Sequence, residues 1–178
     1  MKSRLVILDA NVIIRAFAGN FWTSLVSQYD ISVNSFVLRN EVYYYTDEKG
    51  QKVNIDLESE LANGKIKEIT ATTDQVENLI NQVNPNFLDR IDDGEQEALA
   101  LLLAGDFDNF KYCTGDTRAI KALSSLGLGT MGVSLEELLT AIGQKRKLPD
   151  PSYSKDAFER KKAEGFQERE MFLKKQPC

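Results

Sequence analysis

Two aspartates follow predicted strands at positions where their carboxylates can meet. Asp9 comes directly after the run Arg4–Leu8, and Asp116 comes just after the run Phe110–Thr114. Short apolar runs of this kind are typical of strands buried on both faces of a parallel sheet. Parallel strands deliver the residues after their carboxyl ends to one edge of the sheet, where sites form. We therefore expect Asp9 and Asp116 to share one crevice.

Two glutamates complete the candidate set. Glu97 lies in the segment IDDGEQEALALLLAG, which has the composition of a largely apolar helix. Leu101 and Ala104 share its helical face, so the helix itself offers Glu97 no polar surroundings. A glutamate in such a place requires a partner or a cation. Glu41 follows the predicted strand Ile31–Val37 and is the fourth acid.

Gathered carboxylates indicate metal-dependent hydrolysis. Carboxylates held close together repel one another and raise one another's pKa, and a divalent cation removes that cost. Mg²⁺ and Mn²⁺ prefer such oxygen ligands, and a metal can activate water for attack on phosphorus. The chain contains no histidine, which excludes imidazole-based zinc sites and every mechanism that needs a histidine base. We expect Mg²⁺ or Mn²⁺ as the cofactor.

Each acid also has a simpler interpretation. Asp9 and Asp116 could cap helices or stabilise turns after their strands. Glu97 could pair with a buried lysine or arginine, and Glu41 could be solvated in a loop. Glu95 is three residues after Asp92, which is the spacing of a capping box.

The remaining pattern predicts an α/β fold, a three-layer α/β/α arrangement around a mostly parallel sheet of about five strands. The predicted strands are Arg4–Leu8, Ile31–Val37, Ile66–Ile69, Phe110–Thr114 and Leu128–Val133. The predicted helices are Val12–Phe17 with Asn11 as its cap, Asp56–Asn63, Thr73–Val83, Glu95–Ala104, Thr117–Ser125 and Ser134–Ile142. A hairpin is expected over Val42–Ile55, around the turn DEKG.

Two prolines divide the chain by composition. Residues 1–148 are expected to form the main domain, and residues 149–178 a charged helical C-terminal extension, because Pro149 and Pro151 mark the boundary. Residues 1–143 carry 12 Lys/Arg and 21 Asp/Glu, whereas residues 144–178 carry 10 and 6. The extension could contact phosphates or be a solvated helix. Two cysteines and no membrane-length apolar run favour a reducing, cytoplasmic location without membrane association.

Four blocks of the sequence resemble the signature of the PIN-domain family. They are LDANVII near the N-terminus, Glu41, GEQEALAL at residues 94–101 and TGD at residues 114–116, in the family's order and spacing. The resemblance covers about residues 3–140. It implies a parallel sheet flanked by helices and a Mg²⁺- or Mn²⁺-dependent ribonuclease. Many bacterial and archaeal members are toxins of toxin–antitoxin pairs.

The resemblance also implies roles for individual residues. The implied metal-binding acids are Asp9, Glu41, Glu97 and Asp116. Asn11 and Thr114 would be polar residues that support these ligands. Within GEQEALAL the family pattern favours Glu97, and Glu95 is the weaker candidate. RNA would be the substrate, and the implied protein partners are a small antitoxin and a second copy of the chain.

Other interpretations stay open at this point. Arg15 and Arg118 could contact RNA phosphates, although surface charges are commonly only solvated. Tyr43, Tyr44 and Tyr45 could stack on bases or could pack within the hairpin. The alternative function is a catalytically inactive PIN-like module that binds RNA or protein. A metal-dependent phosphatase of the haloacid-dehalogenase-like type is a third hypothesis. Such enzymes have a second aspartate two residues after the first, where this chain has Asn11.

Overall fold

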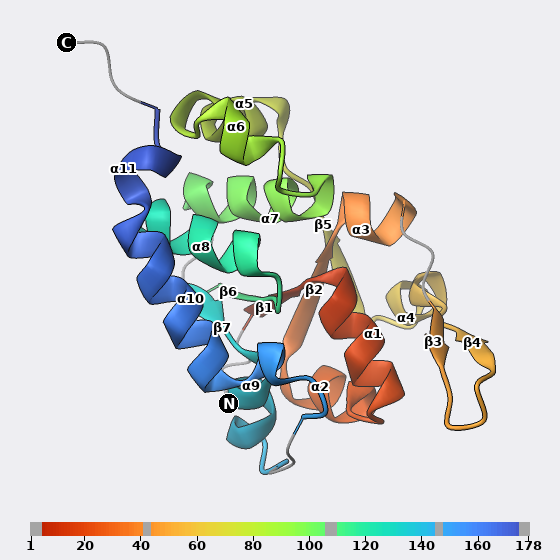
Figure 1. Cartoon of the computed structure of the whole chain (residues 1–178). Coiled ribbons are helices and arrows are strands. Elements are labelled where there is room, and N and C mark those ends of the chain that lie inside the picture. Colours follow the sequence, from red (N-terminus) through yellow and green to blue (C-terminus); the bar gives the residue numbers. More distant parts are fainter. Residues whose placement is uncertain (1–4, 41–43, 106–109, 145–147, 175–178) are drawn as a thin grey trace.

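The computed structural model describes residues 5–40, 44–105, 110–144 and 148–174. Figure 1 shows a central sheet with helices on both of its faces and a long C-terminal helix along one side. The predicted three-layer α/β/α fold is confirmed. Within the described ranges, no helix is both long enough and apolar enough to cross a membrane.

The strands form two separate sheets. The central sheet contains β1 (Leu5–Leu8), β2 (Asp30–Asn34), β5 (Ile66–Ile69), β6 (Lys111–Cys113) and β7 (Gly132–Val133). The antiparallel hairpin consists of β3 (Tyr44–Thr46) and β4 (Lys52–Asn54), as the sequence predicts for this insertion. Part of the predicted hairpin, Val42 and Tyr43, lies outside the described residues.

The helices lie between and after these strands. Those in the first half are α1 (Ala10–Ala18), α2 (Trp22–Gln28), α3 (Ser35–Asn40), α4 (Leu57–Ala62), α5 (Thr73–Gln82) and α6 (Pro85–Leu88). The others are α7 (Asp93–Ala104), α8 (Thr117–Ser125), α9 (Leu135–Ala141), the 3₁₀ turn η1 (Pro151–Tyr153), α10 (Lys155–Gln167) and α11 (Arg169–Phe172).

The central sheet is parallel throughout, with the strand order β5-β2-β1-β6-β7. The chain builds outward from β1 to β2 and β5, and then returns to place β6 and β7 on the other side of β1. In β1, Val6 is paired with Ile31 on one side and with Lys111 on the other. The strand order therefore reverses between β1 and β6, and ligands bind at such a point in open α/β sheets.

Alternating side chains of the sheet build a core on each face. Val6 and Leu8 belong to the cluster under α1, α2 and α9, whereas Ile7 belongs to the cluster under α7, α8 and α10. All three side chains are fully buried. A strand that packs on both faces has a continuous run of apolar residues, which is why β1 is recognisable in the sequence.

Several predicted boundaries differ from the structure. The strand predicted over Ile31–Val37 ends at Asn34, because the Asn34 side chain accepts the Val37 N–H at 2.9 Å and so begins α3. The strand predicted over Leu128–Val133 is only two residues long. Helices α2 and α6 were not predicted. Asn11 does not cap α1, because the helix begins one residue earlier and Asp9 occupies the N-cap position.

The C-terminal extension packs on the body of the protein. Tyr153 joins one of the two cores, and Phe158 and Phe172 join the other. Helix α10 lies along α8, as Figure 1 shows. Gly165 of α10 lies against the backbone of α8, where an added Cβ would be 2.6 Å from the Cα of Lys121. The extension is therefore part of the folded unit.

Gly165→Ala is expected to destabilise the protein by roughly 1–3 kcal/mol, because the added methyl group meets the backbone of α8. Alanine is the better helix former by about 1 kcal/mol, so a net loss reports the clash between the helices. Gly129→Ala is the matched control, since its Cβ would be 3.4 Å from the flexible Lys162 side chain. Urea unfolding of both variants measures the difference, and equal stability would contradict the close packing.

Candidate active site

Asp9 lies at the carboxyl end of β1 with its side chain only 6% exposed. Its N–H donates to the Cys113 carbonyl oxygen at 3.1 Å, which extends the pairing of β1 with β6 by one residue. Its carboxylate atom Oδ2 accepts a hydrogen bond from the Thr114 hydroxyl at 3.1 Å. The sheet and Thr114 together fix where this carboxylate points.

Asp116 lies beyond the carboxyl end of β6 and caps α8. Its Oδ1 atom accepts the N–H groups of Arg118 at 2.6 Å and Ala119 at 3.0 Å, the bonding pattern of an N-cap residue. Its own N–H donates to the Thr114 hydroxyl oxygen at 3.0 Å. Thr114 is fully buried, so one hydroxyl joins the two aspartates that flank the reversal of strand order.

Glu95 joins Asp9 and Asp116 electrostatically. It lies in the first turn of α7, is 6% exposed, and accepts the Asp92 N–H at 3.4 Å. Burial, followed in order of size by the negative charges of Asp116, Asp9 and Asp92, raises the pKa of Glu95 from 4.5 to about 9. A neighbouring charge has such an effect only at short range in a poorly solvated region. Glu95 therefore lies within electrostatic range of Asp9 and Asp116.

This donor set fits a divalent cation. Carboxylate oxygens are the ligands that Mg²⁺ and Mn²⁺ prefer, and a cation would relieve the repulsion that raises the pKa of Glu95. Among the described residues, no three His, Cys, Asp or Glu side chains form a ready-made cage for a metal. Mg²⁺ is commonly bound by one or two carboxylates and completes its shell with water and phosphate oxygens. Asp9 and Asp116, with Glu95 beside them, could hold it in that way.

The C-terminal extension contributes two residues to the same region. Lys161 of α10 is 8% exposed, and its ammonium group donates to the Gly115 carbonyl oxygen at 2.9 Å. Burial lowers the pKa of Lys161, while the negative charge of Asp116 acts against that change. The Tyr153 ring covers Gly115, where an added Cβ would be 2.7 Å from Tyr153 Cζ. A cation and an aromatic ring thus border the acids.

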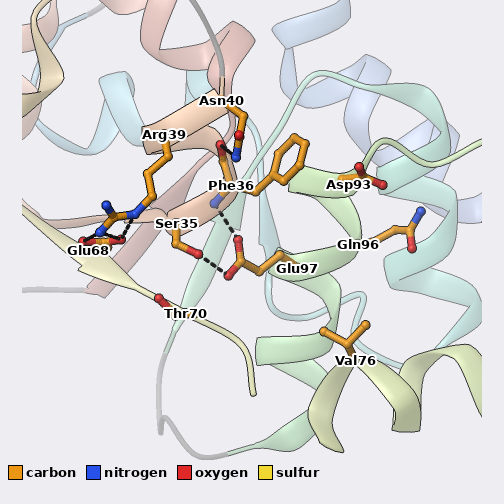
Figure 2. Close-up of a pocket in the computed structure, with 10 residues that line it drawn as sticks. All are labelled: Ser35, Phe36, Arg39, Asn40, Glu68, Thr70, Val76, Asp93, Gln96 and Glu97. Atoms are coloured by element: carbon orange, nitrogen blue, oxygen red, sulfur yellow. Dashed lines mark hydrogen bonds and ion pairs between the residues drawn. The ribbon is translucent and has the colours of Figure 1, made fainter. Parts of the chain in front are cut away.

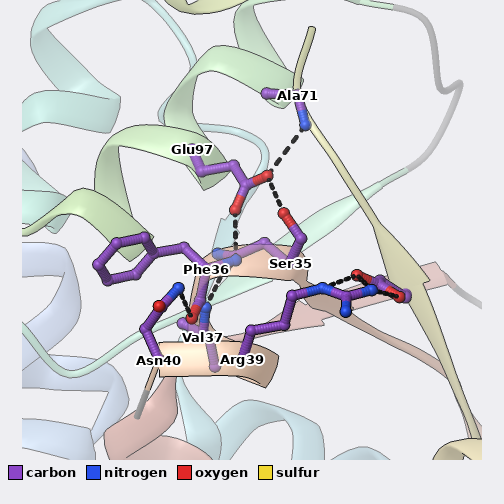
Figure 3. Close-up of polar contacts among 9 residues, drawn as sticks. Ser35, Phe36, Val37, Arg39, Asn40, Ala71 and Glu97 are labelled. Atoms are coloured by element: carbon purple, nitrogen blue, oxygen red, sulfur yellow. Dashed lines mark hydrogen bonds and ion pairs between the residues drawn. The ribbon is translucent and has the colours of Figure 1, made fainter.

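Glu97 points elsewhere and is held by three hydrogen bonds. Its Oε1 atom accepts the Ser35 hydroxyl at 2.7 Å and the Ala71 N–H at 3.1 Å, and its Oε2 atom accepts the Phe36 N–H at 2.8 Å. Figure 3 shows this carboxylate between the first turn of α3 and the segment after β5. We call this arrangement the Glu97 clamp. It ties α7 to the ends of β2 and β5.

Helix geometry separates the two glutamates of α7. Residues two apart are about 200° apart around an α-helix, so Glu95 and Glu97 face nearly opposite sides. Of the four predicted acids, the structure brings together Asp9 and Asp116. It adds Glu95, which the sequence left as the weaker candidate, and it places Glu97 in the clamp. Glu41 lies outside the described residues.

The other predicted residues lie around this site. Thr114 is in the supporting position described above, whereas Asn11 is exposed in the first turn of α1.

The two arginines predicted to contact RNA have partners within the protein. The Arg15 guanidinium donates to Asp150 at 2.7 Å and lies over the Tyr153 ring. The Arg118 guanidinium donates to the Arg90 carbonyl oxygen at 2.7 Å. Both arginines are exposed but already engaged with other groups.

A pocket of about 480 Å³ lies on the Glu97 side of α7. Its lining comes from α3, the end of β5, α5 and the first turn of α7, and Figure 2 shows these side chains around it. Phe36 and Val76 are apolar parts of the lining, and Asn40 and Gln96 contribute amides. This size is within the range of small-molecule sites.

Sequence reasoning missed Lys161 and Tyr153. Lys161 lies among other charged residues in a helix and has no local signal of burial. Tyr153 follows Pro151 in a short turn and could have been noted only as an aromatic residue near a boundary. Their place beside the acids depends on how the extension packs, which spacing along the chain does not encode.

Comparison of the chain with models of known protein families, with curated proteins and with solved structures finds no match.

Proposed function

We propose that this protein is a metal-dependent endoribonuclease of the PIN-domain type. The observation that carries the proposal is that Thr114 joins Asp9 and Asp116 at the point where the strand order of the sheet reverses, with Glu95 in electrostatic range of both. Acids held this close disfavour ionisation of Glu95, and a bound cation would remove that cost. RNA is the proposed substrate, and a small antitoxin and a second copy of the chain are proposed partners.

Each residue has a definite part in the proposal. Asp9 and Asp116 hold the cation, and Glu95 of α7 is a third acid within electrostatic range of them. The Thr114 hydroxyl fixes the Asp9 carboxylate and the Asp116 backbone relative to each other. Mg²⁺ or Mn²⁺ bound there would lower the pKa of water and stabilise the negative charge that develops on the phosphate. Lys161 limits the net negative charge around Asp116.

Asp9→Asn is expected to reduce RNA cleavage by roughly 100-fold or more. Residues that only support a metal ligand contribute about 10–100-fold, so loss of a ligand's charge should cost at least as much. Asparagine keeps the size of the side chain, so the fold should survive. The measurement is cleavage of a labelled single-stranded RNA with Mg²⁺ or Mn²⁺. Asp74→Asn, an exposed position on α5, is the control.

Two outcomes would contradict the proposed function. Cleavage by the unaltered protein that persists in excess EDTA would rule out the metal requirement. RNA binding without cleavage, over both metals and several RNAs, would favour the alternative of a catalytically inactive PIN-like binding module.

A further inference from the structure

We propose that the pocket between α3 and α7 binds one unpaired nucleobase of the RNA substrate. This inference rests on the proposed ribonuclease function and adds where the strand lies on the protein. The pocket and the acids share the first turn of α7, since Gln96 lines the pocket and Glu95 is the residue before it. An α-helix is about 10 Å across, so both sites are close enough to contact one short stretch of RNA.

The lining has the chemistry of a base site. The Phe36 ring offers a flat apolar surface, and Val76 is another apolar part of the pocket. The amides of Asn40 and Gln96 also line it; their nitrogens donate to backbone carbonyl oxygens, and their oxygens can accept from the N–H groups on the edge of a base. Proteins recognise unpaired RNA by stacking bases on aromatic side chains and bonding their edges.

The charges of the lining disfavour a phosphate group. Arg39 is the cation of the lining, and its guanidinium is bound to both oxygens of Glu68 at 2.7 and 2.9 Å. Glu97 and the exposed Asp93 add negative charge. An anion entering this pocket would be repelled, whereas a neutral base would not. The pocket and the acids thus suit different parts of one nucleotide chain.

The pocket is rigidly built. The Glu97 clamp ties together α3, α7 and the segment after β5, which all contribute to the lining. Asn34 adds a second tie, because its Nδ2 atom donates to the Gly94 carbonyl oxygen at 2.7 Å. Phe36 takes part in the clamp through its backbone N–H alone. Its side chain can therefore be changed without removing a clamp bond.

The test measures binding separately from cleavage. The Asp9→Asn protein is titrated with fluorescently labelled single-stranded RNA of six to eight nucleotides, and Kd is measured. Adding Phe36→Leu should raise Kd about tenfold, as expected for loss of one base–aromatic stack. Phe36→Tyr keeps the ring and should restore the affinity. The matched control is Phe166→Leu, because Phe166 is an aromatic residue on α10 that is 66% exposed.

Competition identifies the bound group. Adenosine or uridine at millimolar concentration should displace the RNA from the Asp9→Asn protein, and inorganic phosphate at the same ionic strength should not. Equal Kd values for the Phe36→Leu and Phe166→Leu proteins would overturn the inference. So would loss of affinity that Phe36→Tyr does not restore. If the unaltered protein cleaves RNA and Phe36→Leu changes neither Kd nor KM, the base site fails while the proposed function stands.

Discussion

Glu97→Ala is expected to destabilise the protein by roughly 3–5 kcal/mol, because three buried or half-buried donors lose the carboxylate that accepts their hydrogen bonds. The variant leaves the N–H groups of Phe36 and Ala71 and the Ser35 hydroxyl without their acceptor. A cavity adds to the cost, since Glu97 is only 9% exposed. The free energy of unfolding of a domain is about 5–15 kcal/mol, so this single change should remove a large part of the stability.

Urea unfolding in EDTA measures this effect without any contribution from a metal. Glu77→Ala, at an exposed position on α5, is the control and should stay within about 0.5 kcal/mol of the unaltered protein. Glu97→Gln should lie in between, because one amide oxygen can still accept two bonds but the amide nitrogen opposes the Phe36 N–H. A Glu97→Ala protein of unchanged stability that has lost only metal binding would make Glu97 a ligand and not a clamp.

Glu95→Gln is expected to stabilise the metal-free protein at alkaline pH and to reduce its RNA cleavage. Glu95 has a pKa of about 9 in the folded protein and an ordinary value of 4.5. Its protonated form is thus favoured by folding, and this contribution is complete below pH 4.5 and is lost as pH rises towards 9. Between these values the stability should fall by about 1.4 kcal/mol per pH unit. Glutamine cannot ionise, so the variant should lack this slope.

The measurement is thermal unfolding from pH 4.5 to 9 in EDTA, repeated with Mg²⁺. The two proteins should have similar Tm at the acid end, and the variant should have the higher Tm at the alkaline end. Mg²⁺ should raise the Tm of the unaltered protein at pH 8 more than that of the variant, because it compensates the charge of Glu95. Glu77→Gln controls for loss of a surface charge. Parallel pH profiles for both proteins would contradict the raised pKa of Glu95 and its interaction with Asp9 and Asp116.

Most of the fold could be predicted from the sequence because strands and helices here follow strong local patterns. β1 is a buried apolar run, and α8 was predicted with its observed bounds, from Thr117 to Ser125. β7 could not be predicted well, because its pairing is limited to two residues opposite Tyr112 and Cys113. The short helix α2 was missed because its core contacts, made by Trp22 and Leu25, arise from tertiary packing.

The site could be predicted only in part. Asp9 and Asp116 were recognisable, since a position after a parallel strand fixes which edge of the sheet a residue reaches. The surroundings of Glu97 were not, because α7 is apolar on most of its surface and its sequence does not show which segments each of its glutamates meets. The partners of Glu97 include Ser35 and Ala71, which belong to segments far away along the chain.

The packing of the extension has a consequence for biosynthesis. Tyr153 and Phe158 complete cores on opposite faces of the sheet, and the Asn84 N–H donates to the Phe172 carbonyl oxygen at 2.8 Å. These contacts join segments that are far apart along the polypeptide, and such contacts slow folding. A nascent chain on the ribosome would therefore hold an incomplete interior until Phe172 has emerged from the exit tunnel. Until then, the apolar surfaces of α8 and α9 stay open to chaperones.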